Sequence, residues 1–153
     1  MQYSSISATD LLADSPASQL VAEKSIQTPY VLTIDDDGAI VNVILSLLAT
    51  EGYHGIGITN SLKVLRFLDS LHDNLLPRVI LLDLMMPGVS GYDIAANLSQ
   101  NKRYQHIPII IMTANSRVQS FSDIQGAVDY VAKPFHLEPL LVKLKSYLDP
   151  PFP

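Results

Sequence analysis

The segment Val79–Asp83 reads VILLD, four apolar residues followed at once by a carboxylate. A short, continuously apolar run is typical of a strand that is buried on both faces of a parallel sheet. Two similar runs occur elsewhere: VLTI at 31–34 precedes Asp35, and IIIM at 109–112 precedes Thr113. Because these polar residues directly follow buried strands, we expect them at the rim of the sheet.

Helical patterns alternate with these strands. Apolar residues recur at helical spacing within 40–48, 62–71 and 137–148, and a further helix is expected around 94–98. Weaker strand signals lie at 54–59 and 128–132. Five strands that alternate with helices predict an α/β fold, in which a doubly wound, five-stranded parallel sheet lies between two helical layers.

Composition limits the classes of function. Of 153 residues, 48% are hydrophobic and 16% charged, so the chain can bury a core. Fifteen acidic and ten basic side chains give a net charge of −5, which argues against a nucleic-acid partner. The absence of cysteine excludes disulfides and thiolate metal sites. With no secretory signal and no apolar run of membrane-spanning length, we expect a soluble cytoplasmic protein that does not contact membranes.

Composition also divides the chain into three parts. Residues 1–28 are rich in Ser, Ala, Thr and Gln, and we interpret them as a flexible N-terminal extension; an arm docked on the core or on a partner is the alternative. Residues 29–149 are expected to form one domain. Residues 150–153 are a Pro-rich end, after which no output domain is expected.

Carboxylates gather at the predicted strand ends. Asp35 and Asp36 follow one strand and Asp83 follows another. Ligands of doubly wound sheets bind at the carboxyl ends of the strands, so we expect these three side chains to share one cleft. Their mutual repulsion favours a hard divalent cation, and Mg²⁺ suits carboxylate oxygens. The alternative for an Asp run after a strand is helix capping, which we assign to Asp37.

The residues around Asp83 indicate phosphoryl chemistry. An Asp carboxylate can attack phosphorus and form an acyl phosphate. Such a transfer requires that the phosphoryl oxygens are held and their charge is neutralised. Thr113 and Lys133, at the ends of two later strands, offer a hydroxyl and an ammonium for this purpose.

Four motifs together resemble the receiver domain of two-component response regulators. They are VLTIDDD at 31–37, DLMMPGVSGYD at 83–93, MTA at 112–114 and DYVAKPF at 129–135. The resemblance covers residues 30–149 and implies the flavodoxin-like receiver fold. It also implies a stand-alone phosphoacceptor rather than an enzyme, working with a sensor histidine kinase or phosphotransfer protein and a downstream protein target. The oligomeric state is left open.

The resemblance assigns roles to individual residues of the cleft. Asp83 matches the phosphoacceptor. Asp35 and Asp36 match the acidic pair that binds Mg²⁺, together with Asp83 and the backbone carbonyl of Met85. Lys133 matches the lysine that contacts the phosphoryl group, and the bond between Lys133 and Pro134 is expected to be cis.

The resemblance also implies a conformational switch. Thr113 matches the switch hydroxyl and Tyr130 the switch aromatic. Lys133 follows Thr113 by only 20 residues, which is short for this family. We therefore expect the helix between them to be stunted or irregular.

Two alternatives remain open. One is a receiver-like interaction module that takes no phosphate; the complete set of motif residues argues against it. The other is an aspartate-nucleophile phosphatase of the haloacid-dehalogenase type, since the DDDG at 35–38 resembles the opening motif of that family. The short chain, the missing cap domain and the unexplained Lys133 motif argue against this second alternative.

Overall fold

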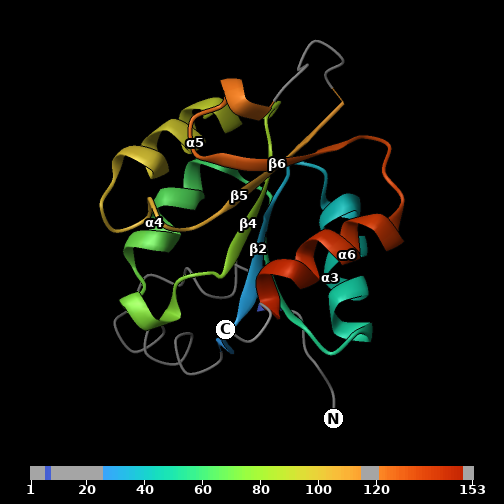
Figure 1. Ribbon diagram of the computed structural model, residues 1–153. Coiled ribbons are helices and arrows are strands. Elements are labelled where there is room, and N and C mark those ends of the chain that lie inside the picture. Colours follow the sequence, from blue (N-terminus) through green and yellow to red (C-terminus); the bar gives the residue numbers. More distant parts are fainter. Residues whose placement is uncertain (1–5, 8–25, 115–120, 150–153) are drawn as a thin grey trace.

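A parallel sheet forms the centre of the molecule (Figure 1). The computed structural model describes residues 6–7, 26–114 and 121–149. The strands are β1 (Ile6–Ser7), β2 (Tyr30–Ile34), β3 (His54–Ile58), β4 (Val79–Asp83), β5 (Ile109–Thr113) and β6 (Ala127–Ala132). They lie in the order β1-β3-β2-β4-β5-β6, and every neighbouring pair is parallel. The chain order reverses at β2, so the cleft beside β2 and β4 is the expected ligand site.

Helices cover both faces of the sheet. The helices are α3 (Gly38–Thr50), α4 (Val64–Asp69), α5 (Gly91–Gln100) and α6 (Leu137–Leu148), and single turns of 3-10 helix form η1 (Ser61–Lys63), η2 (Asp73–Leu75) and η3 (Phe121–Asp123). α3 and α6 lie on one face, and α4 and α5 lie on the other (Figure 1). Among the described helices, none is long and apolar enough to cross a membrane.

The buried strands divide the core into two layers. In β2, β4 and β5 every residue is buried, as continuous apolar runs predict for strands covered on both faces. One layer packs under α4 and α5 and includes Leu32, Ile80 and Phe67. The other packs under α3 and α6 and includes Val31, Leu81 and Leu144. Apolar side chains on both faces therefore pack against the central strands.

The predicted α/β/α architecture is confirmed, with one addition to the sheet. The five predicted strands correspond to β2 through β6, and β1 is a sixth strand that we did not predict. β1 pairs Ile6 with Ile56 and Ser7 with Gly57. The edge of β3 offers unpaired backbone groups, which another extended segment can bind.

The structure describes residues 6–7 and 26–28 of the N-terminal segment 1–28. Ile6–Ser7 is part of the sheet, and Ile26 is buried in the core under α4 and α5. The interpretation of the whole segment as a flexible extension stays a prediction. The rest of the segment, residues 1–5 and 8–25, lies outside the described residues, as does the Pro-rich end at 150–153.

The helix that we expect to be stunted, between Thr113 and Lys133, lies partly outside the described residues. Residues 121–126 contain the 3-10 turn η3 and then a tight turn into β6. Residues 115–120 lie outside the described part. The assignment of Asp37 as a helix cap is also confirmed: its side chain accepts the N–H groups of Ala39 and Ile40 at the start of α3.

Candidate functional site

The sheet brings two distant carboxylates to one edge. Asp83 is the last residue of β4, and Asp35 directly follows β2. The two strands are neighbours, with Ile34 paired to Leu82. The N–H of Asp35 also donates to the carbonyl of Ile58 at the end of β3 (3.2 Å). Three adjacent strand ends therefore fix the positions of these two side chains.

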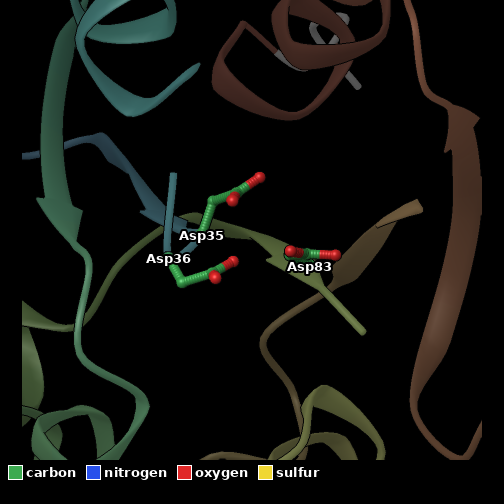
Figure 2. Close-up of side chains that lie close together, drawn as sticks. All are labelled: Asp35, Asp36 and Asp83. Atoms are coloured by element: carbon green, nitrogen blue, oxygen red, sulfur yellow. The ribbon is translucent and has the colours of Figure 1, made fainter. Parts of the chain in front are cut away.

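Asp35, Asp36 and Asp83 form an acidic cluster (Figure 2). One carboxylate oxygen from each lies within 4.8 Å of the other two. Asp35 is fully buried and Asp83 is 4% exposed, whereas Asp36 is open to solvent. Like charges at this separation repel one another strongly where water is scarce, so the arrangement favours a cation between them.

Lys133 reaches into the acidic cluster from the end of β6. Its Nζ lies 2.5 Å from Oδ2 of Asp35 and 3.4 Å from Oδ2 of Asp83. Burial lowers the pKa of Lys133, but the hydrogen bond to Asp35 and the charges of both carboxylates outweigh it, so the pKa lies above its ordinary value. Lys133 therefore stays protonated and offsets part of the negative charge. Its bond to Pro134 is cis, as expected.

The environment of Asp83 penalises its negative charge. Burial and the charge of Asp35 raise the pKa of Asp83 to about 6. The N–H of Met85, which donates to Oδ1 of Asp83 (3.2 Å), and the ammonium of Lys133 act in the opposite direction. Asp83 is therefore mostly ionised at neutral pH. A bound cation, or a covalent bond to an electrophile, would relieve the remaining repulsion.

Thr113 and Tyr130 lie on the neighbouring strands β5 and β6. Thr113 ends β5 and is 1% exposed, and its carbonyl accepts the N–H of Lys133 (2.9 Å). Tyr130 is half-buried and pairs with Ile111, two residues before Thr113. The backbone therefore places Thr113 at the same edge of the sheet as the acidic cluster, and Tyr130 farther back on the adjacent strand.

The loop after Asp83 turns back closely over the end of β4. The N–H of Gly91 donates to the carbonyl of Leu84 (3.0 Å). A Cβ atom at Gly91 would lie 2.1 Å from the carbonyl oxygen of Asp83, so only glycine fits there without a backbone shift. In this loop Met85 is 62% exposed, whereas Met86 is buried. The loop is therefore anchored beside Asp83.

The donor atoms of the acidic cluster fit Mg²⁺. This ion takes oxygen ligands, commonly one or two carboxylates, and retains several waters. Here two buried carboxylates and one solvent-exposed carboxylate converge, and the exposed side leaves room for water. The structure places the acidic cluster, Lys133 and Thr113 at one edge of the sheet, where the strands end.

Comparison with known proteins identifies the family. The family model described as the response regulator receiver domain matches residues 31–145. The chain belongs to this receiver domain family. This membership excludes the haloacid-dehalogenase interpretation, because the DDDG motif belongs to a receiver domain and not to that phosphatase fold.

This receiver domain resembles response regulators from bacteria and plants. It is 33% identical over 124 residues to the DNA-binding dual master transcriptional regulator RpaA of Synechocystis sp., over 78% of this chain and 49% of the relative. It is 31% identical over 112 residues to the two-component response regulator ORR13 of Oryza sativa subsp. japonica, over 71% of this chain and 89% of the relative. The chain spans about half the length of the first curated relatives that it matches.

A solved structure supports the same assignment. Response regulator protein TrrA from Thermotoga maritima, solved in complex with Mg²⁺ and BeF, is 29% identical to this receiver domain. The TM-score is 0.68, and the match covers 79% of this chain and 100% of that chain. The flavodoxin-like receiver fold predicted from the sequence is confirmed.

Proposed function

We propose that this receiver domain accepts a phosphoryl group on Asp83 from a phosphohistidine of a sensor histidine kinase or a phosphotransfer protein. The observation that carries the proposal is the position of Asp83. It is a buried carboxylate at the end of a central strand, and it lies within reach of two further carboxylates and of the Lys133 ammonium.

The proposed transfer exchanges one bond for another. An Oδ atom of Asp83 attacks phosphorus, the bond between phosphorus and the donor imidazole nitrogen breaks, and the leaving imidazole takes a proton from solvent. The pKa of Asp83, about 6, leaves the nucleophile mostly ionised at neutral pH. Lys133 and Thr113 hold the phosphoryl oxygens. The protein therefore acts as a phosphoacceptor that assists its own phosphorylation and dephosphorylation.

Mg²⁺ belongs to the proposed site. Asp35, Asp36, Asp83 and the backbone carbonyl of Met85 would hold the ion, which supplies positive charge for the phosphoryl oxygens. The carboxylate geometry supports the first three ligands. The complex of TrrA with Mg²⁺ and BeF supports the choice of metal.

The proposed output is a conformational change that a partner protein reads. Phosphorylation places new acceptor oxygens beside the end of β5, and the hydroxyl of Thr113 moves toward them. Tyr130, half-buried on the next strand, then fills the vacated space. This alters the surface around β6 and α6, which we propose as the docking surface for a downstream protein.

Mass spectrometry tests the phosphorylation directly. Incubation with Mg²⁺ and the small donor phosphoramidate should add one phosphoryl mass to the wild-type chain and none to Asp83→Asn. The matched control is Asp93→Asn. Asp93 is an exposed aspartate in the first turn of α5, and this variant should be phosphorylated at the wild-type rate. A wild-type chain that gains no mass would favour the interaction-module alternative instead.

A further inference from the structure

Ser61 links the start of η1 to the loop that follows Asp83. It begins η1, shortly after β3, and is 4% exposed. Its hydroxyl donates to the carbonyl of Pro87 (2.8 Å) and accepts the N–H of Val89 (3.0 Å). Both partners belong to the loop that follows Asp83. One side chain therefore satisfies both a donor and an acceptor of that loop.

The turn between these partners packs tightly against Ser61. Gly88 has φ +84, a conformation that favours glycine. A Cβ atom at Gly88 would lie 3.1 Å from Oγ of Ser61 and 3.4 Å from Cγ of Leu62. The turn from Pro87 to Val89 therefore packs closely against the start of η1 and is also hydrogen-bonded to it.

These contacts restrict the position of the Met85 carbonyl. On one side of this carbonyl, the N–H of Met85 is hydrogen-bonded to Oδ1 of Asp83. On the other side, Met86 is buried in the core and the carbonyl of Pro87 is bound by Ser61. The Met85 carbonyl therefore lies between two anchored points, and Ser61 supplies one anchor from a different part of the chain.

We infer that Ser61 is a positioning residue for the Mg²⁺ and phosphoryl site. By holding the turn from Pro87 to Val89, its hydroxyl fixes the direction of the Met85 carbonyl. The inference rests on the proposed function, in which that carbonyl is a metal ligand. Hydrogen bonds behind a ligand orient it before the metal arrives, and their loss typically weakens metal binding. The hydrogen bonds of the Ser61 hydroxyl go to Pro87 and Val89, so Ser61 acts on the site through the loop.

Titration of Mg²⁺ into the full chain by calorimetry tests this role. Ser61→Ala should weaken Mg²⁺ binding about tenfold, because the loop keeps its sequence but loses its anchor. Ser61→Thr keeps the hydroxyl and should bind Mg²⁺ within about twofold of wild type. Ser70→Ala is the matched control: the Ser70 hydroxyl donates to the carbonyl of Phe67 (2.6 Å) in α4, away from the acidic cluster.

Comparing Ser61→Ala with Ser70→Ala separates a positioning role from a general effect on stability. Both variants are expected to lower the melting temperature, but only Ser61→Ala should weaken Mg²⁺ binding at a temperature where all variants are folded. If Ser61→Ala proves too unstable to titrate, Gly88→Ala perturbs the same contact from the loop side and should also weaken Mg²⁺ binding. Wild-type Mg²⁺ affinity in the folded Ser61→Ala or Gly88→Ala protein would overturn the inference.

The titration is independent of phosphorylation, because no phosphodonor is present. A wild-type chain that binds Mg²⁺ but accepts no phosphoryl group overturns the proposed function and leaves the role of Ser61 in Mg²⁺ binding intact. A wild-type chain that binds no Mg²⁺ overturns the inference about Ser61.

Discussion

At the scale of single residues, the acidic cluster destabilises the metal-free protein at neutral pH. Burial and Asp35 raise the pKa of Asp83 in the folded state, so the folded protein holds a proton more tightly than the unfolded chain. The stability that comes from this proton is fully present below about pH 4, the ordinary pKa of Asp. It is lost as the pH rises through about 6.

Asp83→Asn tests this pH dependence. With a chelator present, the variant should have a free energy of unfolding about 1–2 kcal/mol above that of wild type at pH 7. This is less than the raised pKa of Asp83 alone would give, because the acidic cluster is open to solvent at Asp36. The difference should shrink toward zero at pH 4. Urea denaturation at several pH values measures it, and Asp93→Asn serves as the exposed control. A difference independent of pH would contradict the assigned cause.

Thr33 offers a second residue-scale test. It is fully buried in β2, and its hydroxyl is the buried side-chain polar atom that lacks a hydrogen-bond partner within the described residues. Thr33→Val keeps the shape and removes the unpaired group, so it should raise the free energy of unfolding by about 1 kcal/mol. Thr50→Val is the control, because its hydroxyl donates to the carbonyl of Ser46 (2.9 Å). A loss of stability in Thr33→Val would show that this hydroxyl has a partner.

The residue scale also shows which parts of the site the sequence could predict. Asp35, Asp83 and Thr113 were predictable because each directly follows or ends a continuous apolar strand, and parallel strands end at the same edge. Ser61 was not predictable in this way. Its importance depends on how two loops pack, and its own surroundings in the sequence resemble an ordinary helix start. Hydroxyl contacts between loops leave no periodic signal.

At the scale of elements, β6 and α6 are joined by one ion pair. The N–H of Lys133 donates toward β5, and strand alternation therefore turns the N–H of Tyr130 toward the open edge. The side chain of Asp129 accepts this N–H (2.7 Å) and is bound by Lys143 on α6 (2.9 Å). Occupying an outward N–H in this way protects an edge strand from pairing with another chain.

A double-mutant cycle measures this ion pair. Asp129→Asn and Lys143→Met should show a coupling free energy of about 0.5–1 kcal/mol, because both side chains are partly exposed. The pair of Glu51 and Lys145 is the control; its atoms are 3.4 Å apart and its side chains more exposed, so its coupling should be smaller. Equal coupling in both pairs would argue against a special role for Asp129.

The elements differ in how far the sequence could predict them. β2, β4 and β5 were predictable because burial on both faces demands apolar residues throughout. β1 was not, since two residues in a polar segment carry no period, and their pairing depends on the free edge of β3. The short spacing before Lys133 predicts a reduced helix; this stays a prediction, because residues 115–120 lie outside the described part, which begins again with the turn η3.

At the scale of the whole molecule, the two edges of the sheet are unequal. β1 closes one edge beside β3, and β6 forms the other. Thr113 ends β5, next to β6. In the proposed function, a phosphoryl group on Asp83 would therefore act first on the β6 side of the site. The strands β3 and β1 lie beyond β2, on the side away from Thr113 and Tyr130. We therefore expect the signal to leave through β6 and α6.

Hydrogen exchange with and without beryllofluoride, a phosphoryl mimic, tests the direction of the signal. In the presence of Mg²⁺, amide protection should change between residues 121 and 132 and at the start of α6. It should stay constant at Ile6–Ser7 and across β3, because neither contacts the strand that carries Thr113. Asp83→Asn removes the attachment point and should abolish the changes at β6. Changes confined to β1 and β3 would instead assign the output to the N-terminal arm.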